Sequence, residues 1–169
     1  MSIGILITAR LKSTRLKKKV LKEINGKPML FHMVERLKLS ARAQKIILCT
    51  STVSQDDELA DYARKTGILV FRGHPEDVLV RMRDAAERYK IDTIVSCTAD
   101  NPLIDPTYVD KLVDFHRANE NDFSETKGLP FGVFSYVLNF SALQKACKIK
   151  DQSDTEVWGG YFRDTGHFD

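Results

Sequence analysis

A dense group of cationic side chains follows the first apolar run of the sequence. Six of the ten positions from Arg10 to Lys19 are Lys or Arg, and residues 1–8 before them form an apolar run of strand length. Like charges this close together repel one another unless an anion compensates them, which suits the segment to phosphate groups or nucleic acid. A solvated basic turn is the alternative for any charge run. Its position after a first parallel strand, where α/β proteins bind their ligands, favours a phosphate-binding loop.

An acidic residue marks a second segment, TADNPLIDP at residues 98–106. Asp100 ends an apolar run, and a carboxylate there beside Asn101 can hold a hard cation such as Mg²⁺. Asp-Asn-Pro is also a common turn composition, which is the structural alternative for Asp100, whereas Asp105 is more typical of a helix cap. Both segments follow predicted strands, so they would lie at the same edge of a parallel sheet. Phosphoryl or nucleotidyl transfer requires such a pairing of a cation cluster with a metal-binding acid.

Composition restricts the class of protein that presents these groups. The chain has 169 residues, 43% of them apolar and 29% charged, as in an ordinary globular domain. A net charge of +3 is too small for a general nucleic-acid binder, which favours phosphate on a small ligand. Cys49, Cys97 and Cys147 have neither CxxC nor metal-ligand spacing, so a reducing, cytoplasmic location is expected. No apolar stretch approaches the roughly 18 residues of a membrane span.

Alternating strand and helix patterns must position the two marked segments. Short apolar runs predict strands at residues 1–8, 45–50, 68–71 and 92–98. Amphipathic stripes predict helices at residues 29–39, 54–66, 75–89 and 106–119. The series predicts a single α/β domain over residues 1–169. It is a three-layer α/β/α sandwich whose middle layer is a mostly parallel, doubly wound sheet of Rossmann-like type. Farther on, residues 129–137 predict an aromatic-rich strand, residues 141–147 a short helix, and residues 155–168 show no clear period.

Three segments, in the right order, resemble the cytidylyltransferases that activate acidic sugars. ARLKSTRLKKK, which begins at Ala9, is similar to their signature Ala-Arg-x-x-Ser-Thr-Arg-Leu-Pro-x-Lys, and Gly26-Lys27-Pro28-Met29 follows as it does there. FRGHPEDVLVRM (residues 71–82) resembles their Arg-Gly-x-x-Glu-Asp-Val-Leu-x-Arg, and DNPLIDP their Gly-Asp-x-Pro-Leu-Ile-Asp-Pro. The family includes the 3-deoxy-manno-octulosonate and acylneuraminate enzymes, and the likeness is greatest to its spore-coat polysaccharide branch. It implies the fold of the nucleotide-diphospho-sugar transferases.

The resemblance also implies roles for individual residues. Arg10 and Lys19 would be the catalytic cations that neutralise the CTP phosphates, and Asp100 would bind Mg²⁺. The implied nucleotide-binding set is Ala9, Arg10, Ser13, Arg15, Lys19, Asp77 and Arg81. A first-turn helix acid and a solvated helical Arg are the alternatives for Asp77 and Arg81. The implied reaction transfers CMP from CTP to an acidic or related sugar for surface polysaccharide or glycan biosynthesis, with release of pyrophosphate and no covalent enzyme intermediate.

Some positions depart from the family pattern. Lys17 and Lys18 stand where Pro and Gly are usual, and Ala99 stands where Gly precedes the metal-binding acid. A later Asp that completes the metal site in the family has no counterpart before Asp169, so we expect this chain to lack the C-terminal part of the family's domain.

The expected partners are CTP and a sugar acceptor, with neither nucleic acid nor membrane, and the likeness is compatible with a homodimer. Two alternatives stay open: a non-catalytic nucleotide-binding domain, and a nucleic-acid-binding protein that uses the basic loop. No motif specifies the acceptor sugar, because sugar choice depends on the shape of the pocket.

Overall fold

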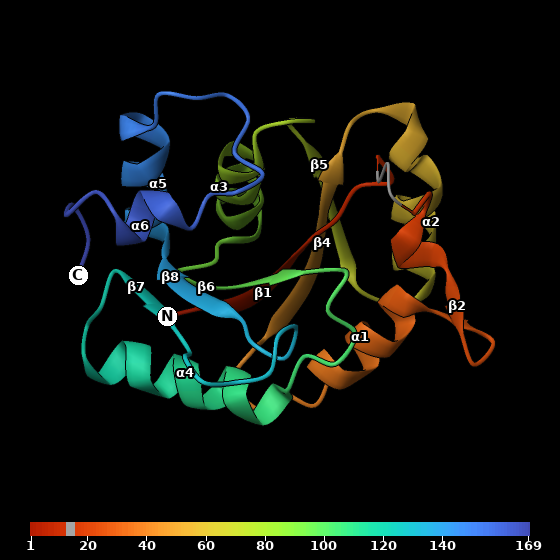
Figure 1. The fold of residues 1–169 in the computed structure, drawn as a ribbon, viewed down its shortest axis with the longest axis horizontal. Helices are drawn as coiled ribbons and strands as arrows, with labels where there is room; N and C mark the ends of the chain where they lie inside the picture. Colours follow the sequence, from red (N-terminus) through yellow and green to blue (C-terminus); the bar gives the residue numbers. More distant parts are fainter. Residues whose placement is uncertain (13–15) are drawn as a thin grey trace.

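The computed structural model of the protein describes residues 1–12 and 16–169. The strands of its main sheet are β1 (Ile3–Thr8), β4 (Lys45–Ser51), β5 (Leu69–Gly73), β6 (Thr93–Thr98), β7 (Phe123–Glu125) and β8 (Tyr136–Asn139). Their order across the sheet is β5-β4-β1-β6-β8-β7 (Figure 1). The first four are mutually parallel, β8 is antiparallel to β6, and β7 is antiparallel to β8. The predicted mostly parallel, doubly wound α/β fold is therefore confirmed.

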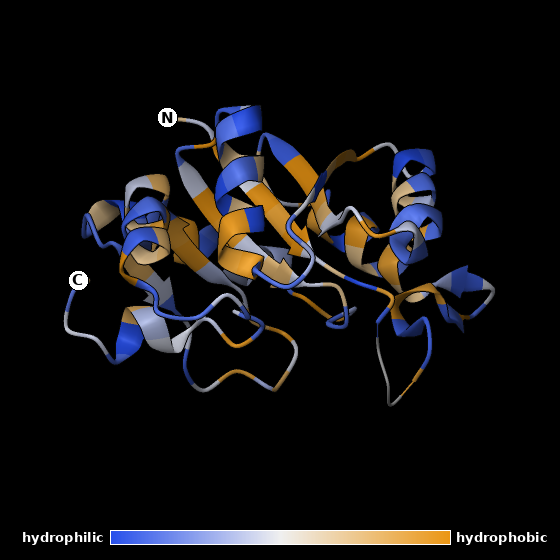
Figure 2. Ribbon diagram, turned by 90° about the horizontal axis from the view of Figure 1, so that it is seen from above, coloured by the Kyte–Doolittle hydropathy of each residue, from blue (hydrophilic) through white to orange (hydrophobic). Residues whose placement is uncertain are grey.

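Helices cover both faces of this sheet. One face carries α1 (Met29–Leu37), α2 (Asp57–Lys65) and α4 (Pro106–Ala118), and the other carries α3 (Val78–Tyr89), α5 (Phe140–Ile149) and the short α6 (Gly160–Arg163) (Figure 1). The alternation of side chains along β1 explains the two cores: Ile5 and Ile7 pack with α1, α2 and α4, whereas Leu6 packs with α3 and α5. Figure 2 shows the hydrophobic colour concentrated on the strands. None of the helices in the described part of the chain is long and apolar enough to cross a membrane.

The loops that follow the parallel strands gather at one edge of the sheet. After β1 the chain makes a 3₁₀ turn, η1 (Lys19–Leu21), and a two-stranded hairpin of β2 (Glu23–Ile24) and β3 (Lys27–Pro28) before it enters α1. The hairpin turns at Asn25 and Gly26, whose φ angles of 50° and 74° are those that a tight hairpin turn requires. Strand β6 delivers Asp100 to the same edge, because β1 and β6 run parallel.

The start of α3 differs from the prediction. The helix begins at Val78 and not at Pro75, because Asp77 accepts a hydrogen bond from the N–H of Val80 (3.1 Å) as the N-cap. Pro75 and Glu76 therefore stay in the loop after β5. Similarly, residues 54–56 of the second predicted helix form a 3₁₀ turn, η2, ahead of α2.

The predicted strand at residues 129–137 is confirmed only at its last two residues. Strand β8 begins only at Tyr136, and residues 126–135 form a loop. Pro130 lacks an N–H, and Gly132 has a φ of 85°, so neither suits an extended ladder. The three-residue strand β7 is too short to show a period in the sequence. The helix predicted at residues 141–147 is confirmed as part of α5.

Aromatic contacts fix the C-terminal segment, which has no sequence period. Trp158 and Phe162 are buried, and their rings pack on residues of β7 and β8. The Phe162 ring stacks on Phe123 at a centroid distance of 5.1 Å, and Trp158 meets Tyr136 edge-on at 5.4 Å. Such contacts join residues far apart in the sequence, so the segment shows no helical or strand period.

His116 is a buried titratable group that ties α4 to the antiparallel edge of the sheet. Its Nδ1 lies 2.9 Å from Ser124 Oγ, and its Nε2 lies 3.1 Å from Asn139 Oδ1. Burial lowers the pKa of His116, and the hydrogen bond with Asn139 opposes that effect only in part. The unfolded chain therefore binds a proton at this position more readily than the folded chain does.

We expect the free energy of unfolding to fall as pH drops through about 6.5, the pKa of an unfolded histidine. Urea unfolding at about pH 7.5 and 5.5 measures this slope. His116→Gln should flatten it, whereas His167→Gln, at an exposed position, should leave it unchanged. Equal slopes in the wild type and in His116→Gln would show that His116 is not the group responsible.

Candidate functional site

Two loops that follow neighbouring strands meet at an ion pair. Lys19 opens η1 in the loop after β1, and Asp100 follows β6. The Lys19 Nζ lies 2.7 Å from Asp100 Oδ2, although 81 positions separate the two residues. The parallel register that places Thr8 opposite Thr98 explains the meeting, because both loops leave the sheet at the same edge. The structure thus brings together the predicted phosphate-binding cation and the predicted metal ligand.

The Asp100 carboxylate is held in its charged form. Burial raises the pKa of Asp100, but the hydrogen bond and the charge of Lys19 outweigh this effect, so the net pKa is lowered. Its side chain remains 42% exposed and can be reached by a ligand. Asp105, on the same loop, caps α4 as predicted by accepting hydrogen bonds from the N–H groups of Thr107 (2.8 Å) and Tyr108 (3.3 Å).

Asp100 fits one particular kind of metal. Among the residues that the structure describes, no group of three or more His, Cys, Asp or Glu could enclose a metal ion. Mg²⁺ is commonly bound by one or two carboxylates and completes its shell with water and substrate phosphates. A single ionised carboxylate beside a phosphate-binding cation suits that mode of binding. Lys19 would have to leave Asp100 when such a cation binds.

A second acid faces the basic loop from the β5–α3 loop, residues 74–77. Glu76 accepts hydrogen bonds from Arg10 Nη1 at 2.9 Å and from Lys12 Nζ at 3.0 and 3.1 Å. The side chain of Arg10 is 18% exposed and that of Lys12 is 62% exposed, so Arg10 is the more enclosed partner. The hydrogen bonds from Arg10 and from Lys12 lower the pKa of Glu76 to about 2. One carboxylate therefore pairs with two cations of the loop and leaves one positive charge in excess.

The basic loop is anchored through the backbone of Leu11. The Leu11 N–H donates to Asp56 Oδ1 at 2.7 Å, and the Leu11 carbonyl accepts from Gln55 Nε2 at 3.2 Å. The other oxygen of Asp56 accepts from the Ser51 hydroxyl, and Asp56 is buried. Sequence reasoning missed both anchors, and Asp56 in particular because an acid near a helix start is usually read as a cap. We infer that Asp56 positions the loop without needing to touch a ligand.

Asp56→Ala should destabilise the protein and loosen the loop. The substitution leaves the Leu11 N–H and the Ser51 hydroxyl without their acceptor in a buried setting, which costs about 1–3 kcal/mol. We expect a lower midpoint of urea unfolding together with weaker binding of the nucleotide that the sequence resemblance implies. Asp57→Asn is the matched control, because Asp57 is adjacent but 56% exposed and pairs only with Arg72 among the described residues. If both variants behaved alike, the anchoring role of Asp56 would be wrong.

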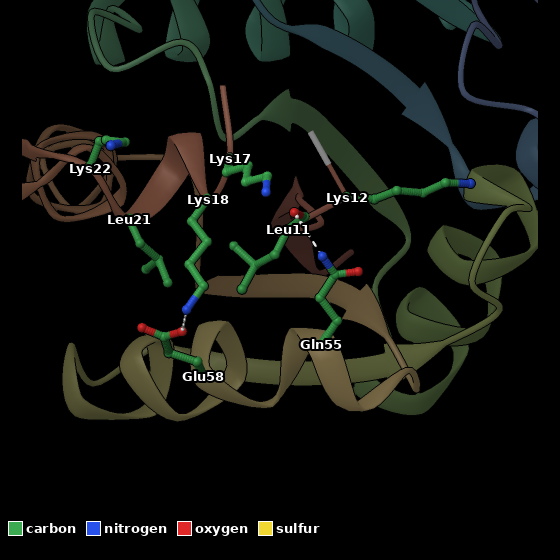
Figure 3. Close-up of a pocket in the computed structure, with 8 residues that line it drawn as sticks. All are labelled: Leu11, Lys12, Lys17, Lys18, Leu21, Lys22, Gln55 and Glu58. Carbon is green, nitrogen blue, oxygen red and sulfur yellow. Dashed lines mark hydrogen bonds and ion pairs between the residues drawn. The ribbon is translucent and has the colours of Figure 1, made fainter. Parts of the chain in front are cut away.

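A cationic cleft of about 670 Å³ lies between the basic loop and α2 (Figure 3). It is lined by Leu11, Lys12, Lys17, Lys18, Leu21, Lys22, Gln55 and Glu58. Lys18 reaches α2, where its Nζ lies 2.5 Å from Glu58 Oε2 (Figure 3). Lys18 has a φ of 53°, a left-handed conformation that favours Gly, the residue usual at this position in the resembled family. Lys17 and Lys22 form no side-chain hydrogen bond or ion pair with another described residue, so they add uncompensated positive charge beside the site.

Asp77 and Arg81 shape the loop that carries Glu76. Asp77 accepts from the Thr155 hydroxyl at 2.9 Å and pairs with Lys150, in addition to capping α3. Arg81 is 1% exposed, so the alternative of a solvated arginine is wrong. Its Nη1 donates to the His74 carbonyl at 2.6 Å, while its buried Nε has no hydrogen-bond partner among the described residues. Direct contact of Asp77 and Arg81 with a nucleotide stays a prediction.

The other predicted nucleotide-binding residues belong to the segment that leaves β1. Ala9 is buried, and its N–H donates to the Cys49 carbonyl at 3.3 Å. Ser13 and Arg15 lie outside the described residues. Arg10 and Lys19, the two predicted catalytic cations, are thus each paired with an acid from a different loop.

Comparison with known proteins places this chain in a family. The model of the Cytidylyltransferase family matches residues 4–163. The spore coat polysaccharide biosynthesis protein SpsF of Bacillus subtilis (strain 168) is 33% identical over 156 residues, which cover 90% of this chain and 65% of that protein. The 8-amino-3,8-dideoxy-manno-octulosonate cytidylyltransferase of Shewanella baltica (strain OS155) is 29% identical over 167 residues, which cover 96% of this chain and 64% of that protein.

A solved structure agrees with these relatives. The cytidylyltransferase from Leptospira borgpetersenii serovar Hardjo-bovis (strain JB197) superimposes with a TM-score of 0.91 at 33% identity, covering 99% of this chain and 74% of that one. The chain spans 65% and 64% of the length of the two curated relatives, which is just under two thirds. The resemblance noted in the three sequence motifs is confirmed, and the chain belongs to the cytidylyltransferase family.

Proposed function

We propose that this chain forms the nucleotide-binding part of a Mg²⁺-dependent cytidylyltransferase that transfers CMP from CTP to an acidic sugar and releases pyrophosphate. The observation that carries the proposal is the meeting of Lys19 and Asp100 at 2.7 Å, because it joins a phosphate-binding cation and a metal-binding acid in one place. The names of the relatives, one acting on 8-amino-3,8-dideoxy-manno-octulosonate and one in spore coat polysaccharide biosynthesis, support an acidic sugar and a surface polysaccharide.

In the proposed reaction the basic residues bind the phosphates and the acidic residue binds the metal. Arg10 and Lys19 compensate the negative charge of the triphosphate, which grows on the oxygens of the departing pyrophosphate. Asp100, together with oxygens of CTP, would hold Mg²⁺, which when bound supplies Lewis-acid neutralisation of the phosphates. Lys19, released from Asp100 in that state, is then free to contact a phosphate oxygen.

The proposed chemistry is a direct displacement at phosphorus. A hydroxyl oxygen of the sugar forms a bond to the α-phosphorus of CTP and loses its proton to solvent or to a base. The bond from that phosphorus to the bridging oxygen breaks, and pyrophosphate leaves with the electron pair. The products are a CMP-sugar and pyrophosphate, and no side chain of this protein needs to form a covalent bond.

Pyrophosphate release from CTP and a panel of acidic sugars tests this function. We expect release only when CTP, Mg²⁺ and an accepted sugar are all present, together with formation of a CMP-sugar. CTP binding without release for any sugar would instead favour a non-catalytic nucleotide-binding domain. Salt-sensitive binding of RNA or DNA without affinity for CTP would favour a nucleic-acid-binding protein, since charge-driven binding to nucleic acid weakens steeply with salt.

A further inference from the structure

The resident partner of Arg10 and Lys12 is a carboxylate of the protein itself. Both cations donate to Glu76, at 2.9 Å from Arg10 and at 3.0 and 3.1 Å from Lys12. Arg10 is the better enclosed cation of this pair, so its compensation matters more than that of a fully solvated charge. The family likeness assigns Arg10 to the phosphates of CTP but gives Glu76 no role.

The loop that carries Glu76 is held in place by hydrogen bonds to the side chains of His74 and Arg81. The N–H groups of Glu76 and Asp77 donate to His74 Nδ1 at 3.2 and 2.8 Å. Arg81, buried beneath the loop, donates to the carbonyls of His74 at 2.6 Å and Pro75 at 3.2 Å. Because these bonds join backbone groups to the side chains of His74 and the buried Arg81, the backbone position of Glu76 does not depend on its own ion pairs. Glu76 can therefore release Arg10 and Lys12 while the loop stays in place.

A carboxylate and a phosphate compete for the same donors. The guanidinium of Arg10 and the ammonium of Lys12 bind oxygen anions of either kind, and phosphate carries more negative charge. A phosphate group that reaches these two cations must replace Glu76, and Glu76 must replace that phosphate when it leaves. The second exchange lowers the free energy needed for an anionic product to depart, because the cations are not left without a counter-ion.

We propose that Glu76 is the resident counter-anion of the pyrophosphate-binding part of this site, where it holds Arg10 and Lys12 before CTP binds and recovers them as pyrophosphate leaves. The inference rests on the proposed function and adds to it a residue that governs product release. Glu76 is then a positioning residue whose charge sets the affinity of the site for pyrophosphate.

Calorimetric titration with inorganic pyrophosphate tests the role of Glu76 without any turnover. At low ionic strength we expect Glu76→Gln and Glu76→Ala to bind pyrophosphate about tenfold more tightly than the wild type, since they remove the competing charge from both cations. Glu58→Gln is the matched control, because Glu58 also pairs with a lysine of the basic loop and is similarly exposed. We expect it to change the affinity for pyrophosphate by less than about twofold.

Unchanged or weaker binding in the Glu76 variants would overturn the proposal, because Glu76 would then only hold Arg10 in place. Equal tightening in Glu58→Gln would overturn it too, because the effect would come from net charge alone. The test is separate from that of the proposed function. If no sugar gave a CMP-sugar, the transferase assignment would fail, while the comparison of pyrophosphate affinities would still decide the role of Glu76.

Discussion

Lys19→Ala is expected to lower kcat/KM for CTP on the order of 10²–10³-fold, the usual loss when one charge-stabilising donor is removed from a transition state. Lys19 is the cation that lies 2.7 Å from the proposed metal ligand, so it is closest to the place where charge would develop. Initial rates of pyrophosphate release over a range of CTP concentrations measure the effect. The Lys19 side chain is 31% exposed, so its truncation should leave the fold intact.

Lys22→Ala provides the matched control for Lys19. Lys22 lies three positions farther along the same loop and lines the cleft beside that loop (Figure 3). Its removal takes the same charge from the loop, and we expect kcat/KM to change by less than about threefold, as for a weakly interacting surface charge. If the two variants lost activity equally, the loop would act through its total charge, and the specific role of Lys19 would be wrong.

Asp100→Asn is expected to lower kcat on the order of 10³-fold in the presence of Mg²⁺, because a neutral amide is a much weaker ligand for a hard cation. The same substitution removes the carboxylate partner of Lys19. We therefore expect the affinity for CTP in the absence of metal to stay equal or to rise, which a damaged fold would not produce. Rates of pyrophosphate release and metal-free CTP titrations measure the two effects.

Asp105→Asn is the control for Asp100 within one loop. Asp105 caps α4, and Asn caps helices about as well as Asp, so both stability and turnover should change little. A loss of turnover in Asp105→Asn as large as that in Asp100→Asn would point to disruption of the loop and not to a lost metal ligand. Thermal unfolding of both variants separates the two cases.

The sequence was informative where a single local pattern decides the outcome. An apolar run followed by Lys and Arg predicted β1 and the basic loop, and an acid at the end of a second apolar run predicted Asp100 at the same edge. Parallel pairing of β1 with β6 then brings Lys19 and Asp100 together, as expected for strands that share a direction. The existence of the four parallel strands and of the main helices could be predicted for the same reason.

The features of the fold and of the site that the sequence did not predict depend on contacts between residues distant in the sequence. Glu76 and Asp56 face the basic loop from positions 66 and 45 residues away from Arg10 and Leu11, and no periodicity records such pairings. Glu76 was assigned to a helix because Pro75 resembles a helix start, whereas the cap at Asp77 moves that start forward. Likewise, the ring contacts of Trp158 left no pattern in the sequence.

The internal pairing of the loop cations changes how the basic segment is understood. Composition indicated a cluster of cations whose charge only an external anion would compensate. In the structure, Arg10 and Lys12 are compensated by Glu76, Lys18 by Glu58 and Lys19 by Asp100. Three carboxylates thus pair with four cations of the described part of the loop, so the site keeps a net positive charge, and we expect ligands to bind by exchange of partners.

The most direct test of the central claim, that Lys19 and Asp100 form one site for metal and triphosphate, is the effect of Mg²⁺ on the affinity for CTP. Calorimetry would measure the dissociation constant of CTP with and without Mg²⁺ in the wild type and in Asp100→Asn. Because the coupling between two ligands at one site is reciprocal, we expect Mg²⁺ to tighten CTP binding about tenfold or more in the wild type and hardly at all in the variant. An equal effect of Mg²⁺ in both proteins would contradict the account, because Asp100 would then not be the residue that joins metal to nucleotide.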